Sequence, residues 1–196
     1  MSTTRWKLDP AHTDISFSAK HMMITTVRGT FGDVDGTLEI DDAHPTTARG
    51  EITVQAASLS TGFGARDTHL RSADFFNVDA YPRITVRFDG VELVKSADYR
   101  VSADVTIRDV TKPVTFAVEH VGETTNFQGT RHIAFTATAT VNREEWGLSW
   151  NMALETGGWL VGKDIKLVVE VVADEDAEAG IEREPERERE LVGSAA

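Results

Sequence analysis

The residues most able to do chemistry lie in one charged segment, RDTHLRSADFF, at positions 66–76. Arg66 and Asp67 are adjacent and His69 follows, so the segment offers a cation, a carboxylate and an imidazole. Such a set could transfer protons or contact a polar head group. We favour a structural role, in which Arg66 and Asp67 form an ion pair and Asp67 caps the first turn of a helix.

A second candidate is His21, because it continues the alternation of Ile15, Phe17 and Ala19 toward an interior. Three roles remain open for it: a buried histidine bonded to backbone or carboxylate, which we favour, a contact with a ligand head group, or a metal ligand. The spacing of the six histidines matches no helical metal-binding pair.

No catalytic motif accompanies these residues. The sequence contains no G-x-S-x-G, H-E-x-x-H, Walker or dinucleotide-binding glycine motif. Glu144 and Glu145 are adjacent, and consecutive residues of a strand face opposite sides, so they are poorly placed to act together. The absence of cysteine excludes disulfides, thiolate ligands and a cysteine nucleophile. We therefore predict no catalytic residue, no metal and no cofactor.

The elements that position these side chains read as strands, because apolar and polar residues alternate with a period of two. Turn-forming pairs such as Asp41-Asp42 and Asp89-Gly90 separate them, which is typical of an antiparallel sandwich or barrel. The alternation predicts strands over 15–19, 52–56, 84–88, 99–107, 114–118, 133–141 and 165–171, with weaker ones over 27–31 and 34–40.

The charged segment breaks this pattern. Residues 66–73 can form two helical turns, and Pro82 limits how far a helix could continue. We expect a short helical segment around 66–76 that caps the open end of the sheet, with one of Phe75 and Phe76 turned inward as a plug.

Two interpretations of the inward-facing aromatic residues remain open. Composition alone favours a core filled by nine phenylalanines and four tryptophans packed on one another. The alternative is a cavity, since an antiparallel barrel of about eight strands is wide enough to hold one ligand. Methionine suits such a wall because it adapts to a flexible guest. Trp146, Trp150 and Met152 share one phase of alternation and would lie on the same face.

Charge and hydropathy exclude several classes of partner. From Asp174 onward there are nine acidic residues and three arginines, so residues 174–196 are predicted to be an acidic, flexible tail that could dock a basic partner. The body is mildly acidic and has no basic stripe, which argues against nucleic acid. No apolar run reaches the length of a membrane helix, and MSTTRWKLDP does not resemble a secretory signal, so we expect a cytoplasmic protein without a transmembrane segment.

Five blocks in order, LDPAHTDISFSAKHM, VRGTFGDVDGTLEI, RDTHLRSADFFNVDAYPRITVRF, VTIRDVTKPVTF and NREEWGLSWN, resemble the YceI-like family of bacterial lipid- and polyisoprenoid-binding proteins. The similarity runs from about residue 6 to residue 173. It implies an all-β domain over 1–173, built as an extended, lipocalin-like antiparallel barrel of about eight strands around an apolar tunnel. Family members bind an isoprenoid tail or a related amphiphile there, and many are periplasmic.

The resemblance therefore implies binding, transport or storage of a long-chain isoprenoid or similar lipid, such as a polyprenyl phosphate, a quinone or a fatty acyl derivative. The alternative is an enzyme that acts on such a lipid with His21 or His69 as acid or base. A homodimer is a further expectation by analogy. The polar contacts expected at the tunnel mouth are His21, Arg66, Asp67 and His69. The apolar contacts expected along the tunnel are Phe17, Met22, Phe31, Leu70, Phe75, Phe76, Phe88, Val105, Phe116, Phe135, Trp146, Trp150 and Met152.

Overall fold

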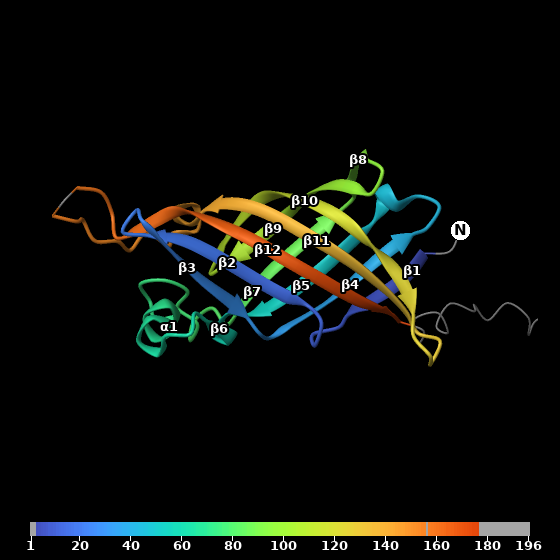
Figure 1. The fold of residues 1–196 in the computed structure, drawn as a ribbon, viewed down its shortest axis with the longest axis horizontal. Coiled ribbons are helices and arrows are strands. Elements are labelled where there is room, and N and C mark those ends of the chain that lie inside the picture. Colours follow the sequence, from blue (N-terminus) through green and yellow to red (C-terminus); the bar gives the residue numbers. More distant parts are fainter. Residues whose placement is uncertain (1–2, 156, 177–196) are drawn as a thin grey trace, which may run out of the picture.

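The computed structural model describes residues 3–155 and 157–176, whose strands form an elongated antiparallel barrel (Figure 1). Eight strands close the ring, because the last strand in the order pairs back onto the first. The predicted all-β fold with an extended barrel of about eight strands is thereby confirmed. In ring order the strands are β1 (Thr3–Leu8), β4 (Val34–Asp41), β5 (Arg49–Gln55), β7 (Arg83–Asp89), β9 (Asp98–Ile107), β10 (Val110–Thr125), β11 (Arg131–Asn142) and β12 (Val161–Glu175).

The long strand β12 pairs with two strands in succession along one edge. Its first part pairs with β2 (Asp14–His21), and its last residues pair with β1. β3 (Thr25–Phe31) continues the sheet beyond β2, but it pairs with β6 (Leu59–Ser60) through two residues only. The hydrogen-bonded wall is therefore incomplete at the β2–β3 end of the barrel.

The helical segment lies at this incomplete end. α1 (Gly64–Arg71) sits beside β3 and β6 in Figure 1. The helix begins two residues earlier than predicted and ends two residues earlier, and turns follow it up to Phe76. The segment therefore lies beside the short β3–β6 ladder, at the incomplete end of the wall. The three short 3-10 helices are η1 (Pro45–Thr47), η2 (Ala56–Ser58) and η3 (Arg143–Trp146).

All nine predicted strands are present, and three more were missed. The missed strands are β1, β6 and β8 (Glu92–Lys95), of which β8 pairs only with β9. β1 carries Trp6 and Leu8, which are almost fully buried, but two inward residues are too few for a clear alternation.

Tight turns join the neighbouring strands. Gly90 has a φ of 89° between β7 and β8, and Ser96 has a φ of 49° before β9. At the β9–β10 turn the left-handed residue is Arg108, with a φ of 58°.

The end of the barrel lies close to the predicted domain boundary. β12 continues to Glu175, two residues past 173, and Asp174 pairs there with His132 across the ladder. The predicted flexible tail falls mostly on residues 177–196, which lie outside the described part of the chain. Within residues 3–155 and 157–176, no helical segment has the length and hydropathy that a membrane crossing requires.

Candidate ligand-binding cavity

The interior of the barrel encloses a cavity of about 910 Å³, whose lining is predominantly apolar. Its lining residues come from nine strands of the barrel wall and from the α1 segment. A volume near 900 Å³ is in the upper range of small-molecule sites in proteins. Of the two interpretations of the inward-facing aromatic residues, the structure therefore shows the cavity and not the filled core.

Most of the predicted site residues line this cavity. Whether they contact a ligand stays a prediction, but their placement is as expected. The lining includes Phe17, His21, Phe31, Arg66, His69, Leu70, Phe75, Phe76, Phe88, Val105, Phe116, Phe135, Trp146 and Trp150.

Met22 and Met152 do not line the cavity, and their predicted placement is wrong. They are exposed by 45% and 56%. Met22 and Met23 both have positive φ, so the alternation of β2 stops at His21, where the chain turns back into β3. The segment after Trp150 likewise leaves the barrel wall, because Met152 lies in a loop and not in a strand.

Phe75 and Phe76 both line the cavity, although only one of them was expected to face inward. They lie in a turn, where the opposite-face rule of strands does not apply. Phe75 is 5% exposed, and its ring centroid lies 5.5 Å from that of Trp150. Phe76 packs edge-on against Phe31 at 5.7 Å. The two rings thus attach the α1 segment to two different parts of the wall.

Arg66 and Asp67 do not form the predicted ion pair, and Asp67 does not cap the helix N-terminus. Both side chains bind Thr61 instead. Asp67 Oδ1 accepts hydrogen bonds from the backbone N–H of Thr61 at 2.9 Å and from its hydroxyl at 2.5 Å. Arg66 Nε donates to the same hydroxyl at 2.7 Å. The N-cap is Phe63, which makes no side-chain capping bond. Asp67 is buried but is not part of the cavity lining, so its predicted role as a ligand contact is not supported by its position.

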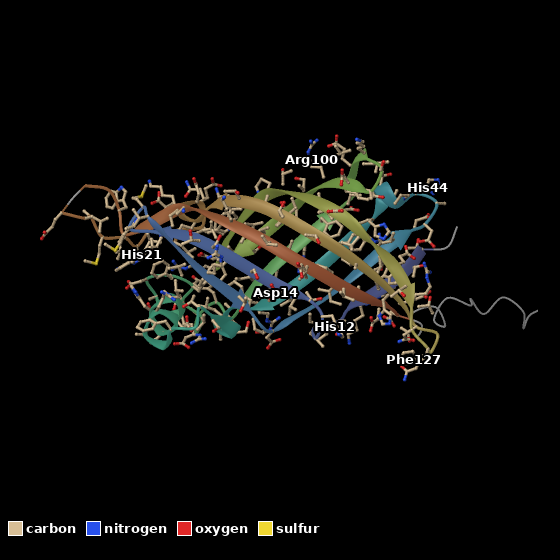
Figure 2. All side chains as sticks on the ribbon, in the orientation of Figure 1. His12, Asp14, His21, His44, Arg100 and Phe127 are labelled. Carbon is tan, nitrogen blue, oxygen red and sulfur yellow. The ribbon has the colours of Figure 1, made fainter. Side chains whose placement is uncertain are left out.

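The two candidate histidines lie in different surroundings. His69 Nε2 is 2.9 Å from Asp74 Oδ2, and its ring is edge-on to those of Trp150 at 4.5 Å and Phe75 at 5.2 Å. His21 lies at the end of β2, at the opposite end of the barrel from Phe127 (Figure 2). In the described ranges, no three histidine, aspartate or glutamate side chains gather in a way that could hold a metal ion.

The cavity reaches the surface beside α1, because Phe63 lines it and is also 59% exposed. The Arg66 guanidinium lies 5.6 Å from the Phe63 ring centroid, so this opening carries both an apolar ring and a cation.

Comparison with known proteins agrees with this architecture. Residues 6–173 match the family described as the YceI-like domain. The chain belongs to the YceI-like family. A UPF0312 protein of Staphylococcus aureus (strain bovine RF122 / ET3-1) is 37% identical to this YceI-like chain over 164 residues, which are 83% of this chain and 93% of the relative.

Solved structures share the YceI-like barrel. Campylobacter jejuni YCEI protein superposes with a TM-score of 0.67 at 26% identity, covering 80% of this chain and 89% of that one. Burkholderia cenocepacia BcnA gives a TM-score of 0.72 at 19% identity over 84% and 98% of the two chains. A polyisoprenoid binding domain from Saccharophagus degradans gives 0.63 at 14% identity over 89% and 99%. The last two likenesses concern the fold alone.

One buried charge of this YceI-like domain was missed by the sequence analysis. Arg143 lines the cavity and is only 5% exposed. Burial lowers the pKa of its guanidinium, while the negative charge of Glu144 acts in the opposite direction. A signal was available, because Arg143 continues the inward phase of residues 133–141 just as His21 continues that of residues 15–19.

The other end of β11 carries a second arginine in different surroundings. Arg131 is 2.9 Å from Glu123 and 3.8 Å from Glu175, and the hydrogen bond to Glu123 raises its pKa. Its guanidinium lies 5.1 Å from the ring centroid of Trp6. Arg131 is therefore paired with carboxylates at this end of the YceI-like barrel, and the apolar inward residues of β11 lie between the two arginines.

Proposed function

We propose that this protein binds a long-chain isoprenoid or a similar amphiphilic lipid in the barrel cavity and carries or stores it. The observation that supports this most directly is the cavity of about 910 Å³ with its predominantly apolar lining. The YceI-like family and a structural neighbour that is a polyisoprenoid binding domain support the same class of ligand. Candidate ligands are a polyprenyl phosphate, a quinone or a fatty acyl derivative.

The energetics favour a long chain. An isoprene unit has about five carbons, and at ~0.8 kcal/mol per buried methylene its transfer from water contributes at most roughly 4 kcal/mol. Association costs about 4–15 kcal/mol, and a micromolar complex needs a net of about −8 kcal/mol. About three to six units therefore suffice, and affinity should depend strongly on chain length.

The test is the affinity of prenyl alcohols of graded length, measured by calorimetry or by competition with a fluorescent lipid. We expect affinity to rise with each added unit until the cavity is filled, and then to level off. A series in which short and long chains bind equally would contradict the proposal. Mass spectrometry of an organic extract from gently purified protein would identify a ligand acquired in the cell.

A carrier differs from an enzyme in leaving its ligand unchanged. We expect a prenyl phosphate incubated with the protein to be recovered intact. Formation of a product that is lost in both His69→Ala and His69→Gln, at unchanged stability, would instead support an enzyme that uses His69.

A further inference from the structure

Two charged side chains are buried in the described part of the chain, and one of them has a buried donor without a hydrogen-bond partner. Asp67 accepts two hydrogen bonds from Thr61. Arg143 donates from Nε to the carbonyl of Gly162 at 3.0 Å and from Nη1 to the carbonyl of Leu148. Its Nη2 is buried and has no hydrogen-bond partner among the described residues.

The charge of Arg143 is also uncompensated. Glu144, its neighbour in sequence, is 2.9 Å from Lys163. No carboxylate of residues 3–155 or 157–176 lies within ion-pair distance of Arg143. A guanidinium keeps its proton in proteins, and buried charges are almost always paired with an opposite charge. The site therefore has the charge and the free donor that an anion requires.

The surroundings strengthen such an interaction. The Arg143 guanidinium carbon lies 5.8 Å from the ring centroid of Phe75, which also packs against Trp150. Aromatic walls exclude water, and a charge-assisted hydrogen bond gains strength where the local dielectric is low. Two bonds to backbone carbonyls hold the guanidinium in place, so little conformational entropy is lost when an anion binds.

The other cations at the cavity are engaged by protein groups. Arg66 binds Thr61, Lys20 Nζ is 3.2 Å from the hydroxyl of Thr26, and Arg131 pairs with acidic residues. Among the described lysine and arginine side chains that line the cavity, Arg143 is thus the one whose buried donor has no hydrogen-bond partner.

We propose that Arg143 binds the anionic head group, a phosphate or carboxylate, of the amphiphile whose tail occupies the cavity; this inference rests on the proposed lipid binding. Arg143 directly follows β11, whose inward residues Val141, Ala137, Phe135 and Ile133 line the cavity. A ligand with its anion at Nη2 would extend its tail along this strand, toward the opposite end of the barrel.

The experiment compares a prenyl phosphate, the prenyl alcohol and the prenyl amine of one chain length on the wild-type protein. A hydrogen bond to a charged group predicts that the phosphate binds about 10- to 100-fold more tightly than the alcohol, and the amine more weakly than either. In Arg143→Gln the phosphate should lose this advantage, while the alcohol, which reports on tail binding and folding, keeps its affinity. Arg100→Gln on the outer wall changes the net charge equally and should behave as wild type.

Equal affinity for phosphate and alcohol in the wild-type protein would overturn the head-group site without any variant. A phosphate advantage that persists in Arg143→Gln would overturn the assignment to Arg143. If Arg143→Gln does not fold, Arg143→Lys replaces it, because lysine keeps a cation but lacks the planar guanidinium. We expect the affinity of this variant for prenyl phosphate, relative to prenyl alcohol, to fall about tenfold. An unchanged ratio of the two affinities would refute the proposal. Displacement of prenyl phosphate by millimolar inorganic phosphate would reassign the site to the free anion. If neither prenyl compound binds folded protein, the lipid-binding proposal fails.

Discussion

Replacing Ala137 by phenylalanine would test whether the cavity holds the ligand tail. Ala137 lies in the middle of β11, lines the cavity, and pairs with Val118 and Val169 on the neighbouring strands. The next residue, Thr138, is exposed on the outer face of the same strand. Thr138→Phe is therefore a matched control, because it places the same ring on the opposite side of the wall.

The size of the effect follows from the volume that the new ring takes from the ligand. Phenylalanine adds about six carbon atoms to alanine, slightly more than one isoprene unit, and at ~0.8 kcal/mol per displaced methylene the loss is roughly 4–5 kcal/mol. Rearrangement of a flexible chain around the ring would reduce this loss of binding free energy. We therefore expect about 10²- to 10³-fold weaker binding of a chain that fills the cavity. A short prenyl alcohol that does not need this space should lose much less.

The assay is the affinity of long and short prenyl alcohols for both variants, together with urea unfolding. Ala137→Phe should bind the long chain weakly and unfold no more easily than Thr138→Phe, since the added ring enters a cavity. If Ala137→Phe bound the long chain normally, the ligand would lie elsewhere. If it were destabilised by the 1–3 kcal/mol typical of an overpacked core, the interior would be filled and the reasoning from the cavity would be refuted.

Three further predictions concern the wall and the ends of the barrel. An added Cβ at Gly29 would lie 2.8 Å from Cε1 of Phe17, so Gly29→Ala should lower the free energy of unfolding in urea by about 1–3 kcal/mol and reduce lipid uptake. Gly32→Ala is the control and should have no effect, because nothing lies within 4 Å of a Cβ added there. Trp146→Phe should cost about 1–3 kcal/mol of unfolding free energy, because it removes a 3.0 Å hydrogen bond to a buried carbonyl of β9. The hydrogen bond between His12 and Asp9 raises the pKa of the histidine and lowers that of the aspartate. The pair should therefore stabilise the fold fully at pH values between the unfolded-state pKa of Asp9 and that of His12. This stabilisation should be lost as pH rises through the raised pKa of His12, and also as pH falls through the lowered pKa of Asp9. Unfolding of wild type and His12→Gln should differ most near pH 5 and converge at pH 9; a constant difference would show that the pair does not contribute.

The barrel could be predicted from sequence wherever one side of a strand faces the interior, since burial then imposes a period of two. β9 shows this most clearly, with Val101, Ala103 and Val105 buried and the residues between them exposed or half-buried. β6 and β8 gave no such signal, because they have two and four residues. Closure of the ring through β1 and β12 depends on contacts between the two ends of the domain, which local alternation does not encode.

The site was predictable to the same extent as the strands. Phe17, Phe88 and Phe135 were placed correctly because they lie inside regular strands. Met22 was misplaced because it was chosen for a flexible side chain that suits a cavity wall, although it is out of phase with Ile15, Phe17 and Ala19 and lies in a turn with left-handed residues. Arg143 was not predicted as a site residue, although it continues the inward phase of residues 133–141; arginine is rarely buried without a partner, so composition gives little reason to expect it inside.

The structure also suggests why this interior stays open although its lining is rich in aromatic residues. Phe17 faces Gly29 across the β2–β3 ladder, and Phe88 faces Gly50 across β5 and β7. In both pairs the ring occupies the space that a Cβ on the glycine would need. The rings therefore pack against the wall, where they gain dispersion contacts without extending to the barrel axis. A bulky residue in place of either glycine would push the ring inward, so the cavity depends on the cross-strand glycine–aromatic pairing as well as on the eight-stranded ring.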